Sequence, residues 1–258
     1  APAPLQQALR MLGGWLAAER GEPYPHTPYA ELLTQLSDTC PPAHGMPVAD
    51  FLQELDSTVL ANTAQLNHPQ YIGHMTQALP WISVLAEAFT ATLNQNQVKI
   101  ETAYVSTLIE KQILGWLHRQ VYQQPDAVYA QAMAATSGAL GNIVNGGTMG
   151  NLTALAVALE KQLPGTRKRG LFAAMQDAAY AGLAVIGSAR SHYSVKKALA
   201  TLGLGENALH LVAVDRDNRI DIAALEDTIA DLKLRKIKVV AMIGIAGTTE
   251  TGAIDPLA

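Results

Sequence analysis

Apolar runs and amphipathic stretches alternate through the second half of the chain, and this alternation constrains the fold most strongly. Three short apolar runs have the composition of buried strands, and the two stretches between them have helical spacing. The strands are predicted at 182–187, 210–214 and 237–245, and the helices at 194–202 and 221–234. This order predicts an α/β fold, in which helices cover a mostly parallel sheet. Ligands of such sheets bind beyond the carboxyl ends of the strands.

Composition argues against several classes of protein. The chain has 258 residues, of which 49% are hydrophobic and 16% charged, so it can bury a sizeable core. Its formal net charge of −4 argues against a nucleic-acid-binding surface, which is usually basic. No apolar run is long enough to cross a bilayer, and Cys40 is the only cysteine, which is typical of a reducing compartment. We therefore expect a cytoplasmic protein that binds neither nucleic acid nor membrane.

The first part of the chain is predicted to be helical and to precede the sheet. Proline and glycine break residues 1–66 into short helices. Longer helices are predicted at 79–93 and 98–122, and the second of these is amphipathic. The sequence thus divides into a helical N-terminal segment, residues 1–98, and the N-terminal part of a larger α/β domain, residues 99–258.

A glycine-rich turn at 145–151 (NGGTMGN) leads directly into a strong helix former at 152–161. Glycines let the backbone approach a ligand closely, and a helix start presents unpaired N–H groups at the positive end of its dipole. Thr148 adds a hydroxyl, so the turn suits a phosphate. It matches neither a P-loop nor a dinucleotide-binding glycine motif. Taken alone, these residues favour an ordinary helix cap over a phosphate site.

Two further polar segments follow predicted strands. The segment 188–194 contains His192, and the segment 246–256 contains Thr248. By residue type alone, His192 is a capping histidine and Thr248 a turn residue. Asp255 precedes a proline and is predicted to cap a helix.

The other reactive side chains are predicted to be structural. Lys196 and Lys197 are tempting as covalent anchors for a carbonyl cofactor, but they fall on a predicted surface helix. His44, His118 and His210 have no partners at metal-ligand spacing. No metal site is therefore predicted.

Taken in order, the motifs resemble those of the group II pyridoxal-phosphate-dependent decarboxylases, the family of the glutamate and aromatic amino acid decarboxylases. The segments 68–76 (HPQYIGHMT) and 93–101 (LNQNQVKIE) resemble the branch of pyridoxal-dependent aspartate 1-decarboxylases. The resemblance covers residues from about 45 to 258. It implies a fold-type I pyridoxal-phosphate transferase-like fold, with a mostly parallel sheet, covering helices and an incomplete large domain.

The resemblance implies a cofactor, pyridoxal 5′-phosphate, and the residues that hold it. Gly147 and Thr148 fall where the family binds the cofactor phosphate. His192 falls where an imidazole stacks on the pyridine ring, and there it can orient a carboxylate or donate a proton, so it is the implied catalytic residue. Thr248 falls near the ring, beside that histidine. Asn145 stands where many relatives carry serine, which leaves one phosphate contact open.

The resemblance also implies a substrate pocket and a reaction. His74 and Thr76 fall in the segment that lines the pocket. The implied reaction is α-decarboxylation of an amino acid, either L-aspartate to β-alanine or L-glutamate to GABA. Family members are homodimers with sites at the subunit interface, which implies the same here. The alternatives are another fold-type I enzyme, such as an aminotransferase or a lyase, and a non-catalytic interaction or regulatory subunit.

The resemblance implies that this chain lacks part of the site. In the family, the aspartate that pairs with the pyridine nitrogen and the lysine that binds the cofactor covalently both follow the position of Ala258. We therefore expect the chain to be inactive alone. Its start at Ala1 rather than Met indicates trimming or a longer parent. It is a fragment of a full-length enzyme, one piece of a cleaved chain, or a non-catalytic half. The first two are favoured, because a sheet cut after three strands leaves an apolar edge.

Overall fold

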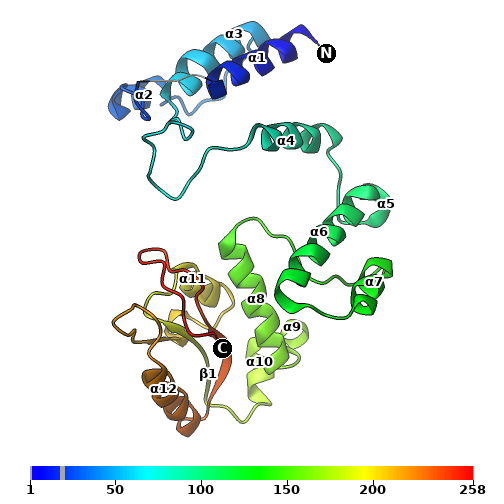
Figure 1. Ribbon diagram of the computed structural model, residues 1–258, viewed down its shortest axis with the longest axis vertical. Coiled ribbons are helices and arrows are strands. Elements are labelled where there is room, and N and C mark those ends of the chain that lie inside the picture. Colours follow the sequence, from blue (N-terminus) through cyan, green and yellow to red (C-terminus); the bar gives the residue numbers. More distant parts are fainter. Residues whose placement is uncertain (1, 18–20, 258) are drawn as a thin grey trace. The chain divides into compact units, whose positions relative to one another are not determined.

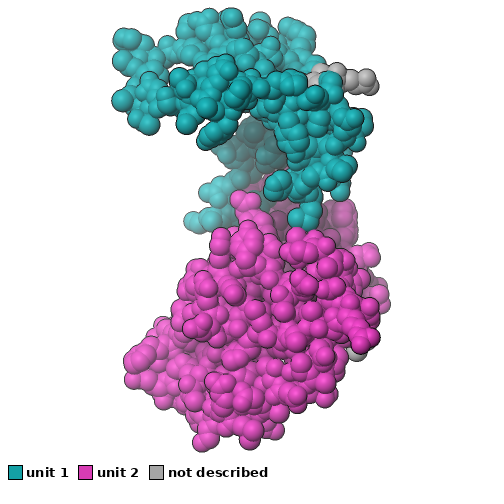
Figure 2. Space-filling model, turned by 90° about the vertical axis from the view of Figure 1, so that its left-hand side faces the viewer, with its two compact units in different colours: residues 1–102 teal, residues 103–258 magenta. Residues whose placement is uncertain are grey.

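Two units make up the part of the chain that the structure describes. The computed structural model describes residues 2–17 and 21–257. Its contacts group the chain into unit 1, Ala1–Thr102, and unit 2, Ala103–Ala258 (Figure 2). In the described residues, no helix combines the length and the apolar character that a membrane span needs.

Unit 2 is built on a parallel sheet of three strands. β1 spans Gly182–Ser188, β2 spans Leu209–Val212 and β3 spans Ile237–Ile243. Their order is β2-β1-β3, and both outer strands pair with β1 in parallel. The predicted α/β fold with a parallel sheet is confirmed, and the carboxyl ends of the three strands meet at one edge.

Helices cover both faces of this sheet (Figure 1). Side chains of α8, α10 and α11 pack on one face, and α12 packs on the other. Alternate side chains of β1 serve the two faces, because Val185 packs toward α8 and α11 while Ala184 and Ile186 pack toward α12. All three are fully buried. The bounds of these helices are α8 Gly147–Gln162, α10 Leu171–Gln176, α11 Ser194–Thr201 and α12 Ile222–Leu234.

β2 and β3 both end before their predicted ends at 214 and 245. Beyond β2, Val214 forms an antiparallel bridge with Ile220, which turns the chain away from the sheet. Beyond β3, the N–H of Ile245 donates to the carboxylate of Asp255 at 2.9 Å. Tertiary contacts therefore set both strand ends, and these contacts leave no trace in the apolar pattern.

The remaining helices of unit 2 are α6 (Val105–Tyr122), α7 (Asp126–Ala134) and α9 (Thr166–Arg169), and α5 (Ile100–Ala103) lies at the boundary between the units. The single helix predicted over 98–122 is wrong at its start, because Tyr104 adopts a φ of 36° and separates α5 from α6. The Thr102 hydroxyl donates to the carbonyls of Asn96 and Lys99 and holds the chain in a turn there.

Short helices form much of unit 1. They are α1 (Ala3–Ala17), α2 (Tyr29–Gln35), α3 (Val48–Glu54), a π-helical turn (Leu55–Val59), a 3₁₀ turn (Leu60–Asn62) and α4 (Trp81–Leu93). The Trp15 indole donates to the carbonyl of Leu60 at 3.1 Å and joins α1 to the 3₁₀ turn. α4 begins after Pro80 rather than at Leu79, because a residue that precedes proline is disfavoured in a helix.

Candidate active site

A cavity of about 230 Å³ opens at the carboxyl ends of β1 and β3. Three parts of the chain line it: the turn after β1, which carries His192, the segment after β3, which carries Thr248, and α8, which contributes Asn151. This edge is where ligands of parallel sheets bind. The structure therefore brings the predicted residues His192 and Thr248 together around one cavity.

A larger groove, of about 850 Å³, runs along α8. Apolar side chains form much of its lining, among them Leu152 and Val157 of α8 and Leu171 of α10. None of the predicted site residues of unit 2 lines it. The cavity at the sheet edge, where polar groups converge, is therefore the candidate active site.

The glycine-rich turn leaves the start of α8 without a side-chain cap. Gly146 precedes the helix with φ 88° and ψ 160°, which only glycine adopts without strain. The N–H of Gly150 donates to the carbonyl of Gly146 and closes the first turn. In the described part of the chain, the three N–H groups before it, of Gly147, Thr148 and Met149, have no hydrogen-bond partner. A β-carbon at Gly146 or Gly147 would meet no atom within 4 Å, so the turn is open to a ligand.

Helical periodicity connects this open turn to the cavity. Asn151 follows Thr148 by one turn of α8, so the two residues and Gly147 share one face of the helix. Asn151 itself lines the cavity. The free N–H groups therefore lie about one helical turn, roughly 5 Å, from the cavity wall.

His192 lies in the turn between β1 and α11, and its imidazole is exposed. Its Nδ1 lies 2.8 Å from Ser194 Oγ and accepts the Ser194 N–H at 3.3 Å. The ring also contacts Tyr193, with the two centroids 4.1 Å apart. His192 therefore caps α11, as its residue type alone predicts, and it lines the cavity at the same time.

Thr248 is buried in a tight loop after β3. The N–H groups of Gly247 and Thr248 donate to the carbonyl of Ala253 at 3.1 and 3.0 Å, and Gly247 has a φ of 100°. The Thr248 hydroxyl lies 2.6 Å from the hydroxyl of Thr251 and accepts the N–H of Ala253 at 3.1 Å. This hydroxyl therefore shapes the loop, as a turn residue does, and places Thr248 in the cavity wall.

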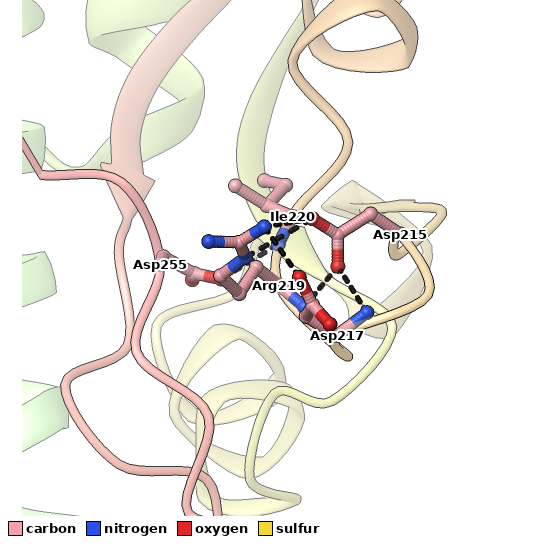
Figure 3. A network of polar contacts seen from close by, with 5 residues as sticks. All are labelled: Asp215, Asp217, Arg219, Ile220 and Asp255. Carbon is pink, nitrogen blue, oxygen red and sulfur yellow. Dashed lines mark hydrogen bonds and ion pairs between the residues drawn. The ribbon is translucent and has the colours of Figure 1, made fainter.

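Asp255 closes this loop through hydrogen bonds to two backbone N–H groups, and its predicted role as a helix cap stays a prediction. Its buried carboxylate accepts the backbone N–H of Ile220 at 2.7 Å (Figure 3). It also accepts the backbone N–H of Ile245 at 2.9 Å. Ile220 precedes α12 and Ile245 follows β3. One side chain thus ties the end of the loop that carries Thr248 to the start of the same loop and to the segment before α12.

A second aspartate holds the turn that presents Ile220 to Asp255. Asp215 Oδ1 accepts the backbone N–H groups of Asp217 and Arg219. The Arg219 guanidinium forms ion pairs with the carboxylates of Asp215 and Asp217 (Figure 3). The hydrogen bond from the Arg219 backbone lowers the pKa of Asp215 below its ordinary value, against an opposing effect of desolvation. The turn therefore favours an ionised Asp215.

His74 and Thr76, predicted to line the substrate pocket, belong to unit 1. Both are exposed. His74 and Met75 adopt positive φ values of 58° and 53°, which mark a constrained turn in residues other than glycine. The Thr76 hydroxyl lies 3.0 Å from the Tyr71 hydroxyl. The substrate role of this turn stays a prediction.

The two lysines of α11 lie on its exposed side, as predicted. Lys197 Nζ stands 4.8 Å from the centroid of the Tyr193 ring, and Lys196 is also exposed. Across residues 2–17 and 21–257, no three His, Cys, Asp or Glu side chains are grouped so that they could hold a metal ion.

Comparison with known proteins decides the family. Residues 31–258 match the family model described as the pyridoxal-dependent decarboxylase conserved domain. The chain belongs to this family. The resemblance drawn from the glycine-rich turn and the segments that follow it is therefore confirmed, and pyridoxal phosphate is the cofactor of the family.

Two curated decarboxylases show how far the similarity extends. The chain is 40% identical over 236 residues to an aspartate 1-decarboxylase of Aliivibrio fischeri. This match covers 89% of this chain and 43% of the relative. It is 29% identical over 235 residues to an L-2,4-diaminobutyrate decarboxylase of Rhizobium meliloti. That match covers 91% of this chain and 42% of the relative. The chain thus spans less than half the length of these two decarboxylases.

Solved decarboxylase structures share the fold. The glutamate decarboxylase domain of a diaminobutyrate-pyruvate transaminase and L-2,4-diaminobutyrate decarboxylase from Vibrio parahaemolyticus matches with a TM-score of 0.82 at 26% identity, over 99% of this chain and 53% of that one. Mouse CSAD matches with a TM-score of 0.80 at 25% identity, over 99% of this chain and 51% of that one. The predicted fold-type I architecture is therefore confirmed for the part of it that this chain contains.

The cavity residues fit the cofactor of the decarboxylase family. The three free N–H groups at the start of α8 suit a phosphate, which prefers the positive end of a helix. The exposed imidazole of His192 offers a flat aromatic face in the cavity wall. Ser191 also belongs to this wall, and its hydroxyl is buried without a hydrogen-bond partner among the described residues.

The sequence pointed to Ser191 only as one of the residues that follow β1, and it gave no role to Asn151 or Ser194. A β-carbon at Gly187 would lie 2.6 Å from Ser191 Oγ, so β1 needs glycine there to accommodate the serine. A glycine inside an apolar strand is a sequence signal of such a close approach. Asn151 and Ser194 carried no signal of their own, because their importance lies in a contact between two helices.

Proposed function

We propose that the protein containing this chain is a pyridoxal-phosphate-dependent decarboxylase that converts L-aspartate to β-alanine, and that L-glutamate is its alternative substrate. The cavity that His192 lines, together with the uncapped start of α8 about one helical turn away, carries this proposal. The choice of L-aspartate is supported by the 40% identity to a protein named aspartate 1-decarboxylase. Pyridoxal phosphate, when bound, supplies an electron sink for the electron pair that departing CO₂ leaves on Cα.

The start of α8 binds the cofactor phosphate in this proposal. Gly147 and Thr148 donate backbone N–H groups, and Thr148 adds its hydroxyl. Gly146 needs no side chain and leaves the approach open. A dianion at this position replaces the missing cap of the helix and is stabilised by the helix dipole.

His192 and Thr248 act on the ring side of the cavity. His192 stacks on the cofactor ring, orients the substrate carboxylate and holds a proton for return to Cα. Thr248 packs beside it in the wall of the same cavity. His74 and Thr76 contact the substrate from the constrained turn of unit 1.

A decarboxylation assay of the full-length protein tests this function. Release of CO₂ is measured with L-aspartate, L-glutamate, L-2,4-diaminobutyrate and L-tyrosine, each with added pyridoxal phosphate. We expect kcat/KM to be highest for L-aspartate, and we expect His192→Ala to reduce it by about a hundredfold while the melting temperature changes little. Highest activity with another amino acid would correct the substrate, and transamination without CO₂ release would exclude a decarboxylase.

A homodimer is proposed as the working assembly, on the basis of an apolar stripe along α4. Its members are Trp81, Ile82, Leu85, Phe89 and Leu93, and each is between 43% and 72% exposed. At 3.6 residues per turn these positions fall within about a third of the helix circumference. A continuous exposed stripe of this kind marks an interface. We assign it to a second copy of the protein.

The cytoplasm is proposed as the compartment. Cys40 is the only cysteine, and it is exposed and unpaired in the structure. A free exposed thiol suits a reducing compartment. Fractionation of cells that express the tagged full-length protein tests this assignment, and recovery with the membrane or secreted fraction contradicts it.

A further inference from the structure

A chain of hydrogen bonds connects α8 to the imidazole of His192. Asn151 Nδ2 donates to Ser194 Oγ at 2.8 Å, and Ser194 Oγ lies 2.8 Å from His192 Nδ1. Ser194 is the first residue of α11 and is only 1% exposed, so water does not compete for its hydroxyl. Asn151 belongs to the helix whose start is the proposed phosphate site. These hydrogen bonds therefore link the helix that carries the proposed phosphate site to the histidine of the cavity.

The direction of these bonds decides where the proton of His192 sits. The backbone N–H of Ser194 can only donate, and it points at Nδ1 over 3.3 Å, so Nδ1 presents a lone pair there. The Asn151 amide occupies one lone pair of Ser194 Oγ, and with the backbone N–H already aimed at Nδ1 the hydroxyl bonds to this nitrogen by donating its hydrogen. Two donors thus converge on Nδ1, and a proton on that nitrogen would face both of them.

We propose that Asn151 and Ser194 are positioning residues that hold His192 as the tautomer protonated at Nε2. In the described residues Nε2 has no hydrogen-bond partner, while the ring lines the cavity. Nε2–H is then the only donor that the neutral ring can offer to a ligand. The catalytic consequence rests on the proposed function: the neutral ring donates its hydrogen bond to the substrate carboxylate from Nε2.

One substitution reverses the direction of these hydrogen bonds while keeping the size of the side chain. In Asn151→Asp a carboxylate replaces the amide, and it accepts the Ser194 hydroxyl hydrogen instead of donating. Ser194 Oγ then turns a lone pair to the ring and favours a proton on Nδ1. Ser194→Ala removes the hydroxyl and leaves only the backbone N–H to bias the ring. The matched control is Asn207→Asp, because Asn207 is exposed before β2, at the opposite edge of the sheet.

Solid-state NMR of the full-length protein labelled with ¹⁵N-histidine measures the tautomer directly. Protonated and bare ring nitrogens of a neutral imidazole have well-separated ¹⁵N shifts, and the His192 signals are assigned by their loss in His192→Phe. Without cofactor and in alkaline buffer, we expect a bare Nδ1 and a protonated Nε2 in the wild type and in Asn207→Asp. We expect Asn151→Asp to raise the population protonated at Nδ1, and Ser194→Ala to give a mixture of both.

Two results would overturn the inference. One is a wild-type His192 that carries its proton on Nδ1. The other is an Asn151→Asp variant with the wild-type tautomer and an unchanged melting temperature. Kinetics give the second readout: Asn151→Asp should lower kcat by about tenfold or more, with a smaller change in KM.

The same measurements separate this inference from the proposed function. If His192 is protonated at Nε2 and the protein releases no CO₂ from any amino acid, the decarboxylase proposal falls and the tautomer assignment stands. If the protein decarboxylates an amino acid and His192 is protonated at Nδ1, the tautomer assignment falls and the decarboxylase proposal stands.

Discussion

At the scale of single residues, His192 shows how one side chain serves both a helix and a cavity. The sequence offered a capping histidine and a catalytic histidine as competing interpretations. Its two ring nitrogens separate these roles, because Nδ1 bonds to the start of α11 while the ring lines the cavity. Capping therefore leaves the proposed catalytic role open and restricts the orientation of the ring. A residue-type argument that weighs one role against the other misses this combination.

Thr148 gives a residue-scale prediction. Loss of its hydroxyl in Thr148→Ala removes one hydrogen bond to a charged phosphate, which contributes about 1.5–3 kcal/mol. We expect pyridoxal phosphate affinity of the full-length protein to fall by about tenfold or more, measured by fluorescence titration. Thr153→Ala, on the same helix but past the first turn, is the control and should bind as the wild type does. Equal affinities in the two variants would remove Thr148 from the site.

At the scale of elements, the periodic parts of unit 2 were predictable and their ends were not. Apolar runs predicted the three strands, since a buried strand is continuously apolar. The ends of β2 and β3 depend on a bridge from Val214 to Ile220 and on a hydrogen bond from Ile245 to Asp255, which the apolar pattern does not encode. The break at Tyr104 likewise follows from a local turn inside an otherwise helical pattern.

The candidate site was predictable only as far as single motifs reach. Gly147, Thr148, His192 and Thr248 stand in short segments with turn or helix-start character, and the structure gathers these segments at one end of unit 2. Asn151 matters because α8 packs on α11, a contact that no local pattern encodes.

Two glycines, one just before α8 and one inside α6, give an element-scale prediction with opposite signs. Gly146 has a φ of 88° before α8, so Gly146→Ala strains the backbone by about 1–3 kcal/mol and should lower the melting temperature and cofactor affinity. Gly115 lies inside α6 with open space around it, so Gly115→Ala should stabilise by about 0.5–1 kcal/mol. Thermal denaturation of both variants checks this. A Gly146→Ala variant as stable as the wild type would contradict the strained turn.

At the scale of the whole molecule, the candidate site and the proposed dimer contact lie in different units. The cavity, the start of α8 and the Asp255 tie all belong to unit 2. The apolar stripe of α4 belongs to unit 1, whose described residues bury few apolar side chains. A unit with such a small core depends on further contacts for its stability. Assembly should therefore stabilise unit 1 more than unit 2.

The stripe of α4 gives the whole-molecule prediction. Phe89→Glu places a charge in the middle of the stripe, where it would lose its hydration without a partner, so it should convert the full-length protein from dimer to monomer. Mass measurement by light scattering after gel filtration checks this. Ser83→Glu adds the same charge to α4 outside the stripe and should leave the dimer intact. A Phe89→Glu protein that remains dimeric would exclude the stripe as the subunit interface, because a charge in a subunit interface cannot stay dry without cost.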